Sequence, residues 1–401
     1  MGVCTAFSLA ERGVQVTLVE KGAICSGASH GNAGWIFPSH SVPIPGPGVI
    51  RKSAGWLLDP ESPLYIKPRA SLSLARWLLR FARACNETAM RRTTALRREL
   101  STLSLARFEK LAALPGLECG FKQLGLLIVC ATKEGLAQAH EELELLEALG
   151  GKGERFTAEA VRERIPVVAP DLAGGVFLPN DAHVTPGDFV RGLAAELDRR
   201  GVTLLTGTEV LDLEWSRRSG PRLQTTRGEL GADELVLATG AWTPSLARRV
   251  GIRVPIESAK GYSITVRRPE VFGELPVILS EAKVGVTPMG QLLRFAGTLE
   301  LAGLDLSVNL RRVRALDRAV RHLLPGLPET EHVETWRGLR PLTPDDLPII
   351  GRPDGTTGLV LATGHGMSGV SQGPITGELV AQLLCGEPSA VDLAPFSPDR
   401  F

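Results

Sequence analysis

Apolar positions along the chain follow two patterns, the three-to-four-residue spacing of helices and the continuous runs of buried strands. At the start of the sequence they predict a helix over 2–12, with Ala6 and Leu9 on its inward face. After a glycine turn, a buried strand over 14–19 ends in Glu20. Helices and apolar strands that alternate in this way are typical of α/β proteins.

The alternation continues to the other end of the chain. Residues 69–113 are strongly helical, and 38–68, rich in proline, are predicted as loop. Further predicted helices cover 133–149, 188–200, 308–324 and 374–384. Predicted strands cover 124–131, 202–205, 234–239, 263–267, 284–288, 292–296 and 359–363, with a small β meander over 207–213 and 224–228.

Length and composition limit the classes of protein to consider. At 401 residues the chain predicts two domains or one large composite. Its 45 basic and 44 acidic residues argue against a nucleic-acid binder, and the six cysteines lack the spacing of a metal site. Without an apolar run of spanning length or a signal segment, we expect a cytoplasmic protein with reduced thiols.

The first twenty residues match the second half of a dinucleotide-binding βαβ unit. Gly2 fits the third glycine of G-x-G-x-x-G, and Glu20 fits the carboxylate that binds ribose hydroxyls. The preceding strand and two glycines are missing, so we expect the true start to lie upstream of Met1. The half-motif alone leaves an ordinary βα unit equally open. If Met1 is the true start, an inactive apoprotein fragment is a further alternative.

Glycine-rich segments elsewhere suit close contact with a ligand. Residues 25–34 are almost all small, and the predicted strand over 234–239 runs into Gly240. Near the end, the strand over 359–363 leads into Gly364-His-Gly-Met-Ser-Gly369 and then a helix. Free N–H groups at such a helix start favour a negatively charged ligand group.

These segments carry a resemblance to a known family. Gly338-Leu-Arg-Pro-x-Thr-Pro-Asp-x-x-Pro-Ile-Ile-Gly351 and Thr363-Gly-His-Gly-x-x-Gly369 resemble the C-terminal signature of the D-amino-acid oxidase and glycine oxidase superfamily. Within it, the chain most resembles bacterial D-amino acid dehydrogenases, through Ser29-x-x-Asn-Ala-Gly34, Leu178-Pro-Asn-Asp181 and Lys260-Gly-Tyr-Ser263. The resemblance covers nearly the whole chain.

The resemblance implies FAD as cofactor and an α/β fold in two domains. A discontinuous Rossmann-like FAD-binding domain, its first strand missing, would comprise 1–70, 175–250 and 337–401. An α+β substrate domain with a mixed sheet would comprise 71–174 and 251–336. Carried over by position, the cofactor-binding residues would be Gly2, Glu20 at the ribose, Ser29, Asn32, Ala33 and Gly34 at the pyrophosphate and flavin, Val210 at the adenine, Gly240 and Trp242 along the channel, and Gly364, Gly366, Met367 and Gly369 around the isoalloxazine.

Three side chains are candidates for substrate contact. Arg340 is expected to hold an amino-acid carboxylate with its planar guanidinium, the alternative being a structural salt bridge. Tyr262 could add a hydroxyl to that carboxylate or be a buried structural tyrosine. His365 could tune the flavin, contact substrate or form a local hydrogen bond. Glycine oxidases place a carboxylate-binding tyrosine on the strand that corresponds to 282–287, and this chain has none there.

The implied reaction is oxidation of D-amino acids to 2-oxo acids and ammonia, with electrons passed to a quinone-type acceptor. Glycine, sarcosine or D-hydroxyproline oxidation remains an alternative. A nicotinamide dehydrogenase would share Glu20 but not the C-terminal glycine turn. A serine hydrolase, suggested by Gly369-x-Ser371-x-Gly373, lacks a later histidine.

The helical stretch over 69–113 is unusually basic. Its ten Lys or Arg residues outnumber three Glu, which fits either a solvated helix face or a docking face for an anionic membrane or an acidic partner. The second alternative would place the protein peripherally at the inner face of the membrane. The basic residues are Arg69, Arg76, Arg80, Arg83, Arg91, Arg92, Arg97, Arg98, Arg107 and Lys110.

Overall fold

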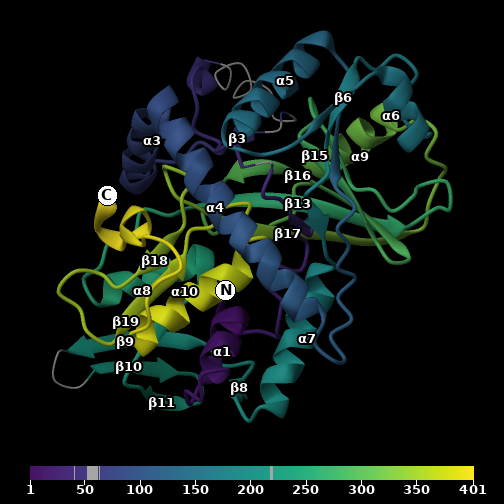
Figure 1. The fold of residues 1–401 in the computed structure, drawn as a ribbon. Coiled ribbons are helices and arrows are strands. Elements are labelled where there is room, and N and C mark those ends of the chain that lie inside the picture. Colours follow the sequence, from purple (N-terminus) through teal and green to yellow (C-terminus); the bar gives the residue numbers. More distant parts are fainter. Residues whose placement is uncertain (40, 52–61, 63, 217–219) are drawn as a thin grey trace.

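A computed structural model describes residues 1–39, 41–51, 62, 64–216 and 220–401. Its largest element is a mixed nine-stranded sheet (Figure 1). The strands run in the order β17 (His332–Leu342), β13 (Glu257–Arg267), β16 (Leu292–Leu301), β15 (Val284–Met289), β14 (Val277–Leu279), β4 (Leu126–Cys130), β6 (Gly174–Leu178) and β5 (Glu154–Phe156), with β3 (Leu64–Ile66) paired to β16. Two pairs, β14 with β4 and β16 with β3, are parallel.

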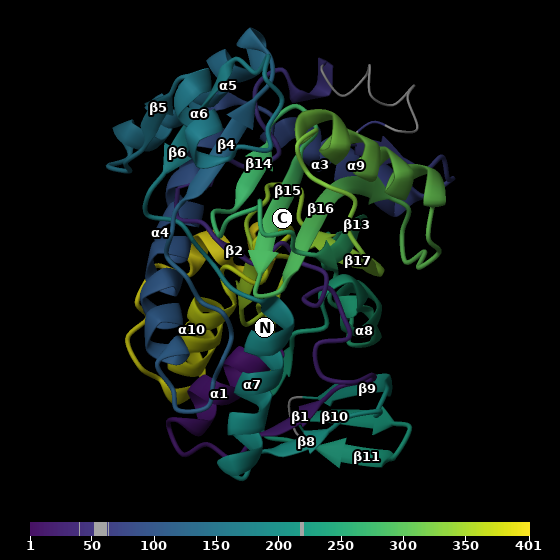
Figure 2. The ribbon, with the colours of Figure 1, turned by 90° about the vertical axis from the view of Figure 1, so that its right-hand side faces the viewer.

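The two faces of this sheet differ in chemistry because side chains alternate along each strand. Tyr262, Ile264 and Phe295 belong to an apolar cluster with helix α9 (Leu310–Leu323), which packs on β13, β15 and β16 (Figure 2). The opposite face carries Ser263 and Arg294, both buried. A buried polar sheet face of this kind indicates a functional surface.

A second layer surrounds the N-terminal helix α1 (Gly2–Ala10). Strand β1 (Thr17–Val19) pairs in parallel with β8 (Thr203–Leu205), and β12 (Leu235–Leu237) pairs in parallel with β19 (Leu359–Thr363), which also pairs with β18 (Ile349–Gly351). The predicted meander forms β9 (Val210–Ser216), β10 (Gly220–Thr225) and β11 (Gly228–Gly231). Within the described residues, the two parallel pairs stand in separate sheets.

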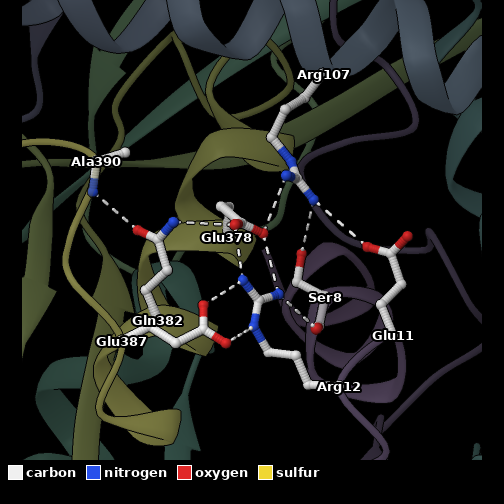
Figure 3. Close-up of polar contacts among 8 residues, drawn as sticks. All are labelled: Ser8, Glu11, Arg12, Arg107, Glu378, Gln382, Glu387 and Ala390. Carbon is white, nitrogen blue, oxygen red and sulfur yellow. Dashed lines mark hydrogen bonds and ion pairs between the residues drawn. The ribbon is translucent and has the colours of Figure 1, made fainter.

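Helices α1 and α10 (Gly373–Cys385) pack with their backbones in close contact. A Cβ at Gly377 would lie 2.5 Å from the Cys4 carbonyl, so only glycine permits this approach. Charged residues fasten the far end of α1: Arg12 lies 2.8 Å from both Glu378 and Glu387, and Arg107 lies 3.0 Å from Glu378 (Figure 3). This network joins α1, α4 and α10.

The predicted basic helix over 69–113 forms two helices, α3 (Leu72–Ala84) and α4 (Glu87–Ala112). The helix is interrupted at Asn86, which is the N-terminal cap of α4. The Asn86 side chain accepts a hydrogen bond from the Ala89 N–H at 2.9 Å. Helix α4 packs on α10 through Leu100 and near α1 through Phe108.

These contacts differ from the predicted domain limits in three places. Helix α4 lies with the nucleotide-side layer, although 71–174 was expected in the substrate domain. Strand β3 and residues 175–178 lie in the large sheet, although both were expected in the FAD-binding domain. Of the predicted loop over 38–68, residues 40, 52–61 and 63 lie outside the described residues.

Of the remaining elements, the helices predicted over 133–149 and 188–200 are present. Helices α5 (Lys133–Ala148) and α6 (Ala158–Arg164) pack on the β4–β6 end of the sheet, and α7 (Pro186–Arg199) packs on α1. Short elements connect the layers: β2 (Trp35–Ile36), β7 (Ala182–His183), η1 (Gly240–Trp242), α8 (Thr243–Arg249), η2 (Ala394–Phe396) and η3 (Pro398–Arg400). Among the described residues, no helix combines the length and the apolarity needed to cross a bilayer.

Candidate functional site

The small-residue segment before β2 lies against the polar face of the large sheet. The Arg294 guanidinium donates from Nη1 to the carbonyls of His30, at 2.6 Å, and Asn32, at 3.1 Å. The Trp35 indole N–H donates to Thr287 Oγ1 at 2.8 Å. The sheet therefore holds this segment through side chains on β15 and β16.

Tight packing fixes the same segment, which contains the predicted ligands Ser29, Asn32, Ala33 and Gly34. Gly34 has φ +77°, and a Cβ there would lie 2.1 Å from the Val184 carbonyl oxygen. The Asn32 side chain accepts a hydrogen bond from the Gly34 N–H at 2.8 Å. Only glycine fits this turn, which joins the two layers of the molecule.

Arg340 projects from β17 onto the polar face with one hydrogen bond, from Nη1 to the Thr298 carbonyl at 2.8 Å. Thr298 has φ +63° and lies in the bulge where β16 shifts against β13. Gly261 lets the guanidinium approach, since a Cβ there would lie 1.9 Å from Nη1. Burial lowers the pKa of Arg340 to about 10.

No carboxylate among the described residues pairs with Arg340, in contrast to Lys260 on β13 and Arg312 on α9, which lie 3.5 and 3.6 Å from Glu300. The structural salt bridge that was the alternative role for Arg340 is therefore not formed with any described residue. The cation remains charged at neutral pH, because even a lowered pKa lies well above it. A partly buried cation with four free N–H donors and no paired carboxylate suits an anionic ligand such as a carboxylate.

Tyr262 lies on the other face of the sheet, and its predicted role beside Arg340 is contradicted. Arg340 stands opposite Ala259 in the β13–β17 register and Tyr262 opposite Arg337, so the two side chains alternate to opposite faces. The Tyr262 hydroxyl donates to Glu300 Oε2 at 3.0 Å and accepts from the Asn309 N–H at 3.2 Å. Burial raises its pKa. Tyr262 is a structural tyrosine beneath α9.

Of the three roles predicted for His365, the structure shows the local hydrogen bond. Its Nε2 lies 2.9 Å from Thr376 Oγ1 on α10, and the side chain is buried. Burial lowers its pKa to about 3, so the imidazole is neutral over the working pH range. A neutral ring bonded to α10 anchors the glycine turn and is not placed as a proton donor to substrate.

The predicted glycine turn lies beside Arg340. Gly364 and Gly366 have φ +78° and +53°, and the Gly366 N–H donates to the Pro341 carbonyl at 2.9 Å. A Cβ at Gly364 would lie 2.7 Å from Thr343 Cγ2. Met367 is exposed at the tip, and Gly369 leads toward α10. The fold thus joins the predicted cofactor turn to the predicted substrate arginine.

The predicted nucleotide residues gather at the other end of the second layer. The Glu20 carbonyl accepts from the Thr208 N–H at 3.0 Å, two residues before Val210 begins β9. Lys21 lies 5.8 Å from the centre of the Trp242 ring. Gly240, with φ +55°, opens η1.

Gly2 begins α1 between two strand ends. A Cβ on Gly2 would lie 3.9 Å from both Leu18 of β1 and Ala238 just after β12. No side chain of the described residues caps the first turn of α1, so its N–H groups and positive dipole end are available to an anion.

Several site residues were not predicted from the sequence, namely Arg294, Trp35, Thr298 and Trp336. The Trp336 ring covers Gly31 and Gly338, since a Cβ at either would lie about 2 Å from it. Arg294 carried a signal, because a lone arginine interrupts the apolar strand over 292–296. No sequence signal pointed to the bulge at Thr298, because bulges depend on strand pairing.

Comparison with known proteins shows the family to which this chain belongs. The family model described as "DAO: FAD dependent oxidoreductase" matches residues 1–383. A protein named D-amino acid dehydrogenase from Xanthobacter autotrophicus is 33% identical over 410 residues, covering 100% of this chain and 97% of that protein.

Two further matches cover nearly the whole chain. A protein named D-amino-acid oxidase from Bradyrhizobium diazoefficiens is 31% identical over 408 residues, covering 100% of this chain and 96% of that protein. The crystal structure of glycine oxidase from Geobacillus kaustophilus matches with a TM-score of 0.82 and 28% identity, over 100% of this chain and 96% of that one.

Proposed function

Because this chain belongs to the DAO family of FAD-dependent oxidoreductases, we propose that it oxidises D-amino acids to 2-oxo acids and ammonia and passes the electrons to a quinone-type acceptor. The observation that carries the proposal is Arg340, a partly buried cation without a carboxylate partner among the described residues. Relatives named D-amino acid dehydrogenase, 33% and 31% identical to this chain, support the same substrate class.

The residues present fit FAD. The uncapped start of α1 at Gly2 suits the pyrophosphate, and Glu20 at the end of β1 suits the ribose hydroxyls. The turns at Gly34 and Gly364 have left-handed backbone, and residues without a side chain suit close approach of the backbone to a ring. Ser29, Asn32, Ala33, Val210, Gly240, Trp242, Gly366, Met367 and Gly369 complete the proposed cofactor site.

Arg340 would bind and orient the substrate. One of its five N–H donors is used by Thr298, so a carboxylate can still take two parallel hydrogen bonds from the fork. Two bonds fix the rotation of the carboxylate and hence the direction of the Cα–H. When bound, FAD supplies the acceptor for the hydride that leaves Cα. Water then hydrolyses the free imine to the 2-oxo acid and ammonia.

The sheet face beside Arg340 would receive the rest of the substrate. It is lined by small residues, Gly261 and Ser263 on β13, Ala296 on β16 and Gly338 on β17. The Ser263 hydroxyl is buried, and no described residue forms a hydrogen bond with it. The Arg340 guanidinium fills the space over Gly261 and the Trp336 ring fills the space over Gly338, so a substrate side chain would meet the Trp336 ring and the Ser263 hydroxyl. Glycine, sarcosine and D-hydroxyproline are the competing substrates that a panel must include.

For the electron acceptor, we propose peripheral contact with an anionic membrane through α3. Leu72, Arg76, Leu79 and Arg83 follow one another at helical spacing, and all four are exposed; Leu72 is 67% and Leu79 55% exposed. Leucines among arginines suit the headgroup region. Arg97 takes no part, because it is 3% exposed, which corrects its assignment to the docking face.

An anaerobic reduction assay tests the substrate. The purified flavoprotein is mixed under nitrogen with single D-amino acids, their L-enantiomers, glycine, sarcosine and D-hydroxyproline, and the visible flavin band is recorded. Bleaching by D-amino acids but not L-amino acids supports the proposal. Bleaching confined to glycine and sarcosine would replace it with the glycine oxidase alternative, and no bleaching by any amine would refute it.

A vesicle assay tests the membrane contact. Wild type is expected to sediment with vesicles that contain anionic lipid and not with neutral ones, and to reduce a short-chain quinone faster than oxygen. Replacing Arg76 and Arg83 by Gln should weaken the sedimentation, since each basic residue near the surface contributes about 1 kcal/mol. Equal sedimentation of the two proteins would refute this contact.

A further inference from the structure

A buried ion pair stands behind the glycine turn at 364–369. Arg97 of α4 pairs through Nη1 with Asp346 Oδ2, and its Nη2 donates to Ser368 Oγ at 3.0 Å. The side chains of Arg97 and Asp346 are 4% and 5% exposed. Since Ser368 belongs to the turn, Arg97 reaches from α4 into the segment that the proposed function assigns to the flavin ring.

Asp346 touches the same turn at a second point. Its Oδ1 lies 3.1 Å from the position that a Cβ on Gly366 would take, so the carboxylate packs against the Gly366 backbone. Its Oδ2 also accepts the Ile44 N–H at 3.0 Å. The pair therefore contacts the turn at Gly366 and Ser368 and ties it to α4 and to residue 44.

The backbone of Asp346 carries strain. Its φ of +59° is a left-handed conformation that glycine adopts freely and aspartate less readily. A carboxylate kept at such a position is explained by what its side chain does, which here is to neutralise Arg97. Either charge left alone would be a buried, unpaired charge beside the turn.

We propose that Arg97 and Asp346 are positioning residues that hold the 364–369 turn in place and keep the region behind the flavin ring electrically neutral. The proposal rests on the proposed function only for the place of the cofactor, not for the substrate. It predicts that changing the charge of the pair changes the affinity for FAD and the reduction potential of the bound flavin. A pair that merely anchored α4 would affect stability alone.

Asp346→Asn is the decisive variant because it removes only the charge. Asparagine has the same shape, tolerates the left-handed region and can still accept the Ile44 N–H bond. Arg97 then remains as an unpaired cation that favours the anionic reduced flavin. We expect a more positive midpoint potential and an FAD dissociation constant raised by about tenfold. The double variant R97M/D346N removes both charges and should return the potential toward the wild-type value.

Two further variants separate charge from position. Arg97→Lys keeps the cation and loses the fork that reaches both Asp346 and Ser368, so FAD binding should weaken while the potential stays unchanged. Asp345→Asn is the matched control, since Asp345 is the neighbouring carboxylate and pairs outward with Arg400 at 2.8 Å. It should leave the FAD dissociation constant within about twofold of wild type and the midpoint potential unchanged.

Potentials are measured by chemical reduction against a reference dye without any amine, and FAD affinity by quenching of flavin fluorescence. The readouts are thus independent of which amino acid is oxidised. A more positive potential for D346N that the double variant reverses supports the proposal. It is overturned if D346N matches D345N in both measurements, or if D346N only lowers the melting temperature.

Discussion

Replacing Arg340 by methionine should abolish most activity without unfolding the protein. A substrate carboxylate bound to Arg340 would lie in a buried site, where truncating one partner of a hydrogen-bonded charge pair costs about 2–5 kcal/mol. Since about 1.4 kcal/mol corresponds to tenfold, kcat/KM should fall by about 30-fold to about 5,000-fold. Arg340→Lys keeps the charge but not the fork, so its loss should be intermediate.

The stability of the free protein should respond differently. Arg340 has one hydrogen-bond acceptor, Thr298, and no carboxylate partner among the described residues, so burying its charge opposes folding. Methionine removes that cost but leaves the Thr298 carbonyl without its donor, which costs about 1–3 kcal/mol. The two terms have opposite signs, and we expect the free energy of unfolding to change by no more than about 1 kcal/mol.

The assay combines kinetics with thermal unfolding. Initial rates with a D-amino acid and an artificial acceptor give kcat/KM, and a simple 2-oxo acid serves as a carboxylate ligand. At 100 times its Kd the ligand should stabilise wild type by about 2.7 kcal/mol and leave Arg340→Met unchanged. Arg337→Met is the control, because Arg337 lies on the same strand but on the opposite face, where it donates to the Leu306 carbonyl at 2.6 Å.

Two results would refute this reasoning. The first is a kcat/KM for Arg340→Met close to that of Arg337→Met. The second is equal stabilisation of wild type and Arg340→Met by the 2-oxo acid, because the carboxylate would then bind elsewhere.

Three further changes test other parts of the site. Tyr262→Phe should lower the free energy of unfolding by about 1–3 kcal/mol, since Glu300 and the Asn309 N–H each lose a hydrogen-bond partner. KM should stay unchanged. A raised KM in steady-state kinetics would contradict the placement of Tyr262 on the face opposite Arg340. Gly34→Ala should purify with little flavin, because its Cβ would lie 2.1 Å from the Val184 carbonyl. Gly27→Ala is the control: a Cβ there meets no described atom within 4 Å, so this variant should keep its full content of flavin, measured as the ratio of flavin to protein absorbance. His365→Gln should make stability less dependent on pH. The folded-state pKa of His365 is lowered from 6.5 to about 3, so the unfolded chain binds a proton that the fold excludes. Wild type therefore loses up to about 1.4 kcal/mol of stability per pH unit as pH falls below about 6.5. Denaturant titrations would contradict this if the free energy of unfolding changed equally in both proteins between pH 7 and pH 5.

Local patterns in the sequence predicted most of the secondary structure. The helix over 133–149 appears as Lys133–Ala148, and the strand over 359–363 appears as Leu359–Thr363. Periodicity suffices for such elements because each buries a side-chain pattern set by neighbouring residues. The family was likewise predictable, because its motifs are short and contiguous. Arg340 could be proposed as a substrate residue because it lies within one of them.

Tertiary structure decided what those residues do. The faces of Tyr262 and Arg340 depend on the register between β13 and β17, and a shift of one residue would have placed them together. Arg97 was assigned to a docking face from its basic neighbours, although it shares a stripe with Leu100, Ser104 and Phe108 that the fold buries. Its partner Asp346 lies 249 residues away. Composition and periodicity describe near neighbours, whereas the charge balance of a buried site is set by residues that only the folded chain brings into contact.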